Sequence, residues 1–260
     1  MNYWLLQSID LANNGDYLDR LADVYPMEED ERRTIPLPVL DKIVYNIENV
    51  GSLGELFDAC IRLDLFPIKD SYVAYLRKNR DAVGRNPETL RRIEDRIRSM
   101  GVERVLERIT EPKETNRQIG PMFRNWLIKQ DIGFPIYGKH QFYNSTNNAL
   151  FDGSDKEMME FARLKLGYER EKGLDFVARV NGKYIIGESK FLTDHGGHQN
   201  AQLNDAFYTL NADVEAVKVA ILDGVCYIKG RNKMYRTITE SYGESNIMSA
   251  LMLEGFLKSI

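Results

Sequence analysis

Two acidic residues and a lysine stand at matched places around a hairpin signal in the second half of the chain. Asn181-Gly182 lies between two runs rich in Val, Ile, Phe and Tyr, and this dipeptide favours a type I′ turn because both of its residues tolerate positive φ. Counting outward from that turn pairs Asp175 with Glu188, so their side chains share a face with Cβ atoms about 5 Å apart. Lys190, two residues further along, shares that face. The spacing predicts two carboxylates and an amine at one end of a hairpin.

The two carboxylates need a positive partner, because like charges directly opposed on a sheet are destabilising. A hard divalent cation such as Mg²⁺ would supply one, since it takes oxygen ligands and retains several waters. Lys190 would then lie beside a metal-bound water or a phosphate oxygen. The alternative is that Asp175 and Glu188 are ordinary strand-end charges on a wet surface, with Lys190 as their counter-ion. The metal site is favoured because the acids occupy matched positions and Glu188 follows the apolar run Tyr184-Ile185-Ile186.

The segments around the hairpin predict a layered α/β core. Asp152-Gly153-Ser154-Asp155 is a capping sequence for a helix from Lys156 to Leu166, and a second helix follows the hairpin and ends at Leu210. The apolar run Val217–Leu222 has the length of a buried strand, and Asp223-Gly224 predicts a turn directly after it. An aromatic hairpin turning at Gly138-Lys139, a basic hairpin turning at 230–233 and a closing helix over 246–257 complete the predicted core.

The first part of the chain predicts a separate, mostly helical region. Apolar residues recur at helical spacing in segments such as Val39–Ile47 and Leu90–Met100. We therefore divide the chain into a helical N-terminal region (1–110) and a core (111–260), with Glu111-Pro112-Lys113-Glu114 as the linker.

Four arginines lie largely off the apolar stripe of the last predicted helix in that region. They are Arg91, Arg92, Arg96 and Arg98. Such a group is either a solvated charged face or a surface that contacts phosphates, because arginine clusters neutralise the charge of the DNA backbone. The sequence leaves both readings open.

Composition and charge are those of an ordinary soluble protein. The 260 residues are 43% hydrophobic and 28% charged, with a net charge of −4, which argues against massive nonspecific coating of nucleic acid but not against a local basic groove. No apolar run approaches the ~20 residues of a membrane span, and the first residues lack the pattern of a signal peptide. Cys60 and Cys226 stand far apart in apolar contexts, as expected of buried free thiols. We expect a cytoplasmic protein with no membrane partner.

The segment Asp175, then Glu188-Ser189-Lys190, resembles the motif of the PD-(D/E)xK nuclease superfamily, with Leu174 where the motif's name has proline. Within the superfamily the chain looks most like a type II restriction endonuclease, and the resemblance covers roughly residues 115–260. It implies a restriction-endonuclease-like core, in which a mixed sheet is flanked by helices.

The resemblance also implies roles for individual residues. Asp175, Glu188 and the carbonyl of Ser189 would bind Mg²⁺, and Lys190 would orient or deprotonate the attacking water. A helix acid often completes such sites, and Glu160 is the candidate in preference to Glu157 on the same predicted helix. The implied activity is hydrolysis of phosphodiester bonds at specific sites in double-stranded DNA by a homodimer, since a palindromic target mirrors a two-fold protein. Residues 111–260 would then be the catalytic core, and the helical region 1–110 would supply dimer contacts, DNA recognition or both. The alternatives are a structure-specific repair or resolvase-type nuclease, or a non-catalytic DNA-binding module with a degenerate nuclease fold.

The loop after the motif is rich in glycine and polar side chains. His195 and His198 invite a zinc interpretation, but no second ligand pair stands at zinc spacing. Contact with DNA suits the loop better, because glycines let the backbone approach a phosphate, while Gln and Asn can read adenine. The alternative is a capped turn into the next helix, and the basic residues near 231 could instead protect a sheet edge. The predicted DNA-contacting residues are His195, His198, Gln199, Asn200, Gln202, Arg231 and Lys233.

Overall fold

The computed structural model describes residues 1–26, 32–112, 119–129 and 132–260. The chain forms two compact units, one comprising Met1–Met27 with Thr115–Ile260 and the other Glu28–Glu114. This division differs from the predicted boundary at residue 110, because the first two helices bury their apolar faces in the core of the sheet-containing unit. An amphipathic pattern shows which face of a helix is buried but not which partner covers it. Part of the predicted linker, 113–114, lies outside the described residues.

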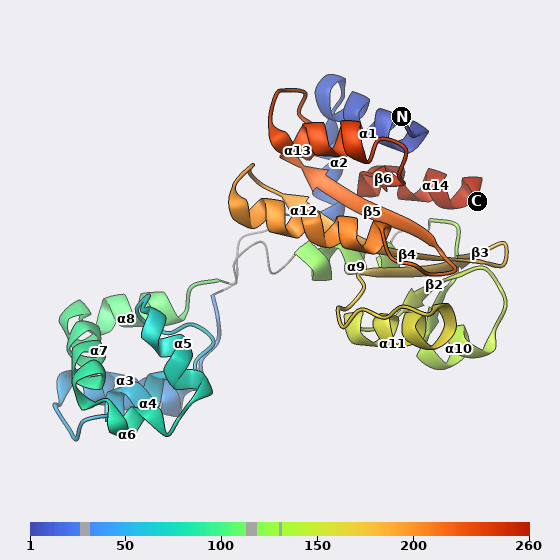
Figure 1. The fold of residues 1–260 in the computed structure, drawn as a ribbon. Coiled ribbons are helices and arrows are strands. Elements are labelled where there is room, and N and C mark those ends of the chain that lie inside the picture. The colour runs from blue at the N-terminus through green and yellow to red at the C-terminus, as the bar shows by residue number, and fades with distance from the viewer. Residues whose placement is uncertain (27–31, 113–118, 130–131) are drawn as a thin grey trace. The chain divides into compact units, whose positions relative to one another are not determined.

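The first unit is built on a six-stranded mixed sheet in the order β1-β2-β3-β4-β5-β6 (Figure 1). The pairs β2/β3 and β3/β4 are antiparallel, whereas β1/β2, β4/β5 and β5/β6 are parallel. The strands are β1 (Ile136–Gly138), β2 (Ala149–Asp152), β3 (Phe176–Val180), β4 (Lys183–Leu192), β5 (Val217–Gly224) and β6 (Ile247–Met248). The predicted mixed sheet flanked by helices is confirmed.

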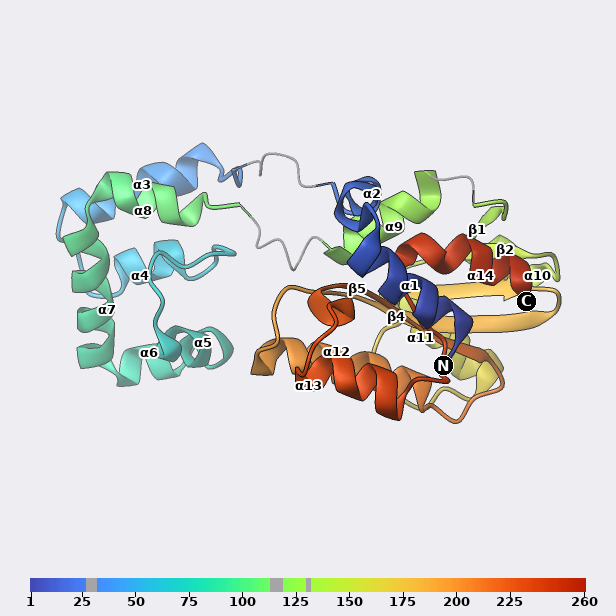
Figure 2. The same ribbon diagram turned by 90° about the horizontal axis from the view of Figure 1, so that it is seen from above.

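Helices cover both faces of this sheet, with α11 and α12 on one face and α1, α2, α9 and α14 on the other (Figures 1 and 2). The helices of this unit are α1 (Tyr3–Asn14), α2 (Tyr17–Val24), α9 (Ile119–Lys129), α10 (Lys139–Asn144), α11 (Asp155–Leu166), α12 (Gly197–Leu210), α13 (Lys233–Arg236) and α14 (Leu253–Ser259). Short 3₁₀ turns lie at η2 (Val225–Tyr227) and η4 (Ala250–Met252), and a π-helical segment at η3 (Thr237–Ser241).

The central hairpin of β3 and β4 has the predicted register. Val180 pairs with Lys183 and Phe176 with Gly187, and the turn residues Asn181 and Gly182 have φ of 49° and 76°, as a type I′ turn requires. Asp175 precedes β3, and its backbone N–H donates to the carbonyl of Gly187 at 3.2 Å. The ladder therefore continues far enough to bring Asp175 beside Glu188.

Side chains of the hairpin alternate between two hydrophobic cores. Phe176 and Ile185 join the core that includes Phe123 of α9, whereas Val177 and Ile186 join the core that includes Phe161 of α11. Because strand side chains alternate with a period of two, Asp175 and Glu188 extend the second row toward α11. The face of the sheet on which the acids lie is thus fixed by the hydrophobic pattern of the strands.

The predicted aromatic hairpin at Gly138-Lys139 is wrong. β1 ends at Gly138 and is followed by α10, and β1 and β2 are parallel. Parallel strands need a crossover connection instead of a tight turn, and here the connection is helical. Phe142 of α10 is fully buried and stacks on Phe151 of β2 with ring centroids 4.8 Å apart. The aromatic residues of this segment pack in the core from a helix, whereas in the sequence they suggested a strand, because aromatic residues favour strands.

The predicted basic hairpin and closing helix are also wrong in part. After β5 the chain enters a 3₁₀ turn and then α13, whose N-cap Asn232 accepts a hydrogen bond from the backbone of Tyr235. The start of the predicted closing helix is instead β6, and the helix begins only at Leu253. β6 pairs with β5 alone, and so short a strand at a sheet edge leaves little period-two pattern to detect.

The second unit is helical, as predicted for this part of the chain (Figure 1). Its helices are α3 (Leu37–Glu48), α4 (Glu55–Cys60), α5 (Ser71–Lys78), α6 (Ala82–Arg85), α7 (Pro87–Met100) and α8 (Val102–Ile109). Buried Glu94 of α7 accepts hydrogen bonds from the N–H groups of Gly54 and Phe57, each at 3.0 Å, and so caps the start of α4. This unit has its own hydrophobic core, around residues such as Phe57 and Ile93.

Both cysteines, Cys60 and Cys226, are buried and free, as predicted. Within the described ranges, no helix is long and apolar enough to cross a membrane.

Candidate active site

The structure brings Asp175, Glu188 and Lys190 together at the end of the central hairpin. The Lys190 ammonium donates to Asp175 Oδ2 at 2.6 Å and to Glu188 Oε2 at 2.7 Å. It also donates to the carbonyl of Ser189 at 3.0 Å, and the backbone N–H of Ser189 donates to Asp175 Oδ2 at 2.9 Å. The predicted metal ligands and the predicted lysine thus form one hydrogen-bonded cluster.

The surroundings of Glu188 disfavour the negative charge of its carboxylate. Its side chain is only 1% exposed, and Oε1 is buried with no hydrogen-bond partner among the residues that the structure describes. Burial, followed by repulsion from Asp175, raises the pKa of Glu188 to about 7 despite the nearby lysines. Burial alone would lower the pKa of Lys190, but the attraction of Asp175 and Glu188 raises it above its ordinary value. The cluster holds a proton or a cation more readily than it holds two bare carboxylates.

A second lysine adjoins the cluster and was missed by sequence reasoning. Lys172 Nζ lies 3.5 Å from Glu188 Oε2 and 2.8 Å from Asp205 Oδ2 of α12. Lys172 stands before β3, outside the hairpin register, and Asp205 is on the helix after β4. Strand periodicity predicts neighbours only within the ladder, so no pattern in the sequence links these two residues to Glu188.

The cluster opens onto a pocket of about 440 Å³. The first turn of α11 forms one wall, and the chain leading into β3 forms another. The lining residues are Asp155, Lys156, Met159, Glu171, Lys172, Gly173, Asp175, Glu188 and Lys190. Ser154 caps α11 through a capping box with Glu157, which confirms the predicted start of that helix and fixes the wall. Solvent-sized groups can therefore reach Asp175 and Glu188 from this side.

The donor set of the cluster fits a hard divalent cation. Carboxylate and carbonyl oxygens of Asp175, Glu188 and Ser189 lie together, and Mg²⁺ binds through one or two carboxylates while it keeps waters or phosphate oxygens as further ligands. The Oε1 atom of Glu188 is buried and accepts no hydrogen bond from the described residues, so this oxygen is available to bind a cation. No group of three or more His, Cys, Asp or Glu that could hold a metal occurs among the residues that the structure describes, so protein ligands alone would not fill such a site.

The structure does not bring Glu160 to this cluster. Its side chain is 44% exposed and lies 3.6 Å from Lys139 Nζ and 3.9 Å from Lys156 Nζ. The other acid considered on this helix, Glu157, serves in the capping box. The phase of α11 thus turns Glu160 toward solvent and lysines, and Lys156, Met159 and Asp155 face the pocket in its place.

The loop after Lys190 is held together mostly by its own side chains. Gln199 is 3% exposed, and its amide donates to Thr193 Oγ1 at 2.9 Å. Asn200 donates to the carbonyl of His195 at 3.1 Å, and Gln202 lies 3.3 Å from the ring of His198. These contacts are those of a turn into α12 that is held by its own side chains, although Gly196 at the N-cap position makes no side-chain cap, and His195 and His198 themselves are exposed.

Arg231 and Lys233 lie on a separate part of the surface. Both are exposed and line a shallow depression with Arg236, Thr237, Glu240 and Ser241 at α13 and η3. Arg236 is paired with Glu240 at 3.1 Å. The structure therefore groups these two cations with one another but not with the carboxylate cluster.

A second buried carboxylate, Asp223 at the end of β5, escaped sequence reasoning. It is 0% exposed and accepts hydrogen bonds from Tyr17 Oη at 2.9 Å, Tyr25 Oη at 3.0 Å, Ser249 Oγ at 2.5 Å and the N–H of Ala250 at 3.2 Å. Burial raises its pKa to about 6, although the hydrogen bonds oppose the shift. The sequence predicts a turn at Asp223-Gly224, whereas in the fold both residues belong to β5. The hydrogen bonds of Asp223 connect this strand with α2 and with the start of η4.

A family model described as Tsp45I type II restriction enzyme matches residues 2–260. Searches among curated proteins and among solved structures gave no match. The family match extends over both compact units and over the whole carboxylate cluster.

Proposed function

We propose that this chain, which belongs to the Tsp45I family of type II restriction enzymes, hydrolyses phosphodiester bonds at specific sites in double-stranded DNA with Mg²⁺ as cofactor. Family membership implies a DNA endonuclease. The metal, the catalytic residues and the assembly are our proposals.

The observation that supports this function is the carboxylate cluster at the end of the hairpin. Asp175 and Glu188 share one lysine, and Glu188 lines a pocket while one of its oxygens has no hydrogen-bond partner among the described residues. A purely structural acid of this burial would be fully hydrogen-bonded. A pair of adjacent carboxylates, one of which keeps an oxygen without a hydrogen-bond donor, instead suits a site that takes up a metal ion and a phosphate.

The residues present divide the work of hydrolysis. Asp175, Glu188 and the Ser189 carbonyl would hold Mg²⁺, which supplies Lewis-acid polarisation of the phosphate and a more acidic water when bound. Lys190 lies between both carboxylates, and their negative charge favours its protonated form. Lys190 therefore donates to a phosphate oxygen or to the attacking water and stabilises charge that develops in the transition state.

We also propose that the enzyme acts as a homodimer. A protein with two-fold symmetry presents the same contacts to both halves of a palindromic site. Light scattering on the purified protein checks this proposal directly, and a monomeric mass both free and bound to DNA would contradict it.

Cleavage of DNA by the purified protein tests the function. We expect discrete fragments from phage DNA in Mg²⁺ and intact DNA in EDTA. Lys190→Ala should remove cleavage, whereas Lys183→Ala, at the exposed far end of the same strand, should leave it unchanged. Intact DNA under Mg²⁺ and Mn²⁺ alike would contradict the proposed activity, and equal loss in both variants would contradict the assignment of Lys190.

A further inference from the structure

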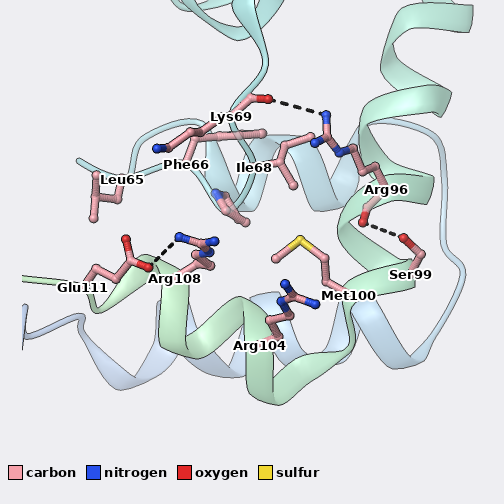
Figure 3. Close-up of a pocket in the computed structure, with 11 residues that line it drawn as sticks. Leu65, Phe66, Ile68, Lys69, Arg96, Ser99, Met100, Arg104, Arg108 and Glu111 are labelled. Carbon is pink, nitrogen blue, oxygen red and sulfur yellow. Dashed lines mark hydrogen bonds and ion pairs between the residues drawn. The ribbon is translucent and has the colours of Figure 1, made fainter.

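The helical unit has a pocket of its own, formed by α7, α8 and the segment before α5 (Figure 3). Its volume is about 460 Å³. It is lined by Leu65, Phe66, Pro67, Ile68, Lys69, Arg96, Ser99, Met100, Arg104, Arg108 and Glu111. We call this the α7–α8 pocket.

Positive charge surrounds the opening of the α7–α8 pocket. Arg96 comes from α7, Arg104 and Arg108 from α8, and Lys69 from the facing segment (Figure 3). All four side chains belong to exposed residues. The one acid in the lining is Glu111, which pairs with Arg108 at 2.8 Å. A chain with a net charge of −4 thus concentrates uncompensated positive charge at this opening.

The neighbouring arginines of α7 show that this surplus is not a general property of the helix. Arg91 pairs with Glu88 at 2.6 Å, Arg92 with Asp70 at 2.5 Å and Arg98 with Glu94 at 3.3 Å. The four arginines that the sequence left undecided therefore separate into three that are neutralised and one, Arg96, that is not.

Two of these cations, Arg96 and Arg104, make few polar contacts with the described residues. Arg96 makes a long hydrogen bond of 3.4 Å to the carbonyl of Lys69. No hydrogen bond or ion pair joins the Arg104 guanidinium to any residue in the described ranges. In Figure 3 the Arg104 guanidinium lies beside the Met100 side chain, and the Arg96 guanidinium lies beside Ile68. Two guanidinium groups without a carboxylate partner among the described residues, next to the apolar side chains of the pocket, form a site for an anion that carries nonpolar atoms.

We propose that the α7–α8 pocket binds the phosphodiester backbone of DNA, with Arg96 and Arg104 on phosphate oxygens and Phe66, Ile68 and Met100 against the sugar. The proposal rests on the proposed function, because it takes DNA as the substrate. Arginine forks match phosphate geometry and release counterions when they bind it. The helical unit thereby adds a sequence-independent grip on DNA that the catalytic cluster does not provide.

The salt dependence of DNA binding tests this grip. We would measure fluorescence anisotropy of a labelled random-sequence duplex with the full-length protein in EDTA, over a series of NaCl concentrations. Removing one phosphate contact lowers the slope of log K against log[salt] by about 1. We expect Arg96→Ala/Arg104→Ala to lower it by about 2 and to weaken binding at least tenfold at fixed salt. Arg91→Ala, on the same helix but paired with Glu88, should bind as the wild type does.

A charge-preserving variant separates the grip from an effect on folding. Arg96→Lys/Arg104→Lys keeps both positive charges, so its slope should stay close to that of the wild type. A double alanine variant with the wild-type slope would overturn the proposal, even where the wild-type protein cleaves DNA with Mg²⁺ and the proposed function stands. A wild-type protein that neither binds nor cleaves DNA would overturn both proposals.

Discussion

Glu188 and Asp223 are two buried carboxylates of one sheet, and they have opposite surroundings. Both side chains are almost completely inaccessible, at 1% and 0% exposed. Asp223 accepts hydrogen bonds from three hydroxyls and one backbone N–H, all of them neutral donors. Glu188 instead has two lysines on one oxygen and none of the described groups on the other. Equal burial thus accompanies a saturated acid in one place and an unsaturated acid in the other.

The difference separates a structural acid from one that awaits a ligand. A buried polar group is normally hydrogen-bonded, because an unmade hydrogen bond costs its full desolvation. Asp223 obeys this rule and joins α2 to the end of β5 through Tyr25. Glu188 breaks it next to Asp175 and a pocket. Raised pKa values alone would not separate the two, since burial raises both.

The largest expected effect is the loss of cleavage in Glu188→Gln. The substitution keeps the shape of the side chain but removes the charge that would bind Mg²⁺, so we expect cleavage to fall by a factor of roughly 10³ or more. Single-turnover assays with plasmid DNA measure it. Because burial and Asp175 already disfavour the charge, the free energy of unfolding at pH 8 without metal should be unchanged or higher. A variant that keeps cleavage would place the metal elsewhere.

The matching variant at the saturated acid, Asp223→Ala, should act on stability instead. It leaves the hydroxyls of Tyr17, Tyr25 and Ser249 without their acceptor. Each unsatisfied buried group costs about 1–3 kcal/mol, part of which rearrangement recovers, so we expect a loss on the order of 3 kcal/mol. Urea denaturation measures it. Undiminished stability together with abolished cleavage would reverse the assignment of the two acids.

The dependence of stability on pH gives a further test of the saturated acid. The folded-state pKa of Asp223 is raised from 3.8 to about 6, so the folded protein holds its proton more tightly than the unfolded chain does. Its contribution is therefore fully present below about pH 4 and is lost as the pH rises to about 6, by on the order of 2–3 kcal/mol. The difference in unfolding free energy between wild type and Asp223→Asn, followed from pH 4 to 7, measures this contribution of Asp223. A difference that does not change with pH would contradict the raised pKa.

The comparison also shows what the sequence could and could not predict. The hairpin that carries Glu188 was predictable to the residue, because Asn181-Gly182 fixes the turn and strand alternation then fixes the faces. Asp223 was not, since its partners come from distant parts of the chain, such as Tyr17, which is 206 positions away, and Ser249, which is 26 positions away. Lys172 falls between these cases, close to the motif but outside the ladder. Contacts within a hairpin can be predicted from the local sequence pattern, whereas contacts between distant segments that meet only in the folded protein cannot.

The smallest expected effect concerns Glu160, the helix acid that the nuclease resemblance suggested. An acid that takes part in metal binding must lie close to Asp175 and Glu188, and Glu160 does not. Its side chain is exposed and near Lys139 and Lys156, where ion pairs contribute at most about 1 kcal/mol. Glu160→Gln should therefore change cleavage by less than about threefold, in the same single-turnover assay that records the loss in Glu188→Gln. A loss comparable to that of Glu188→Gln would mean that α11 turns Glu160 toward the metal when DNA binds, and that the unsaturated acid is one member of a larger site.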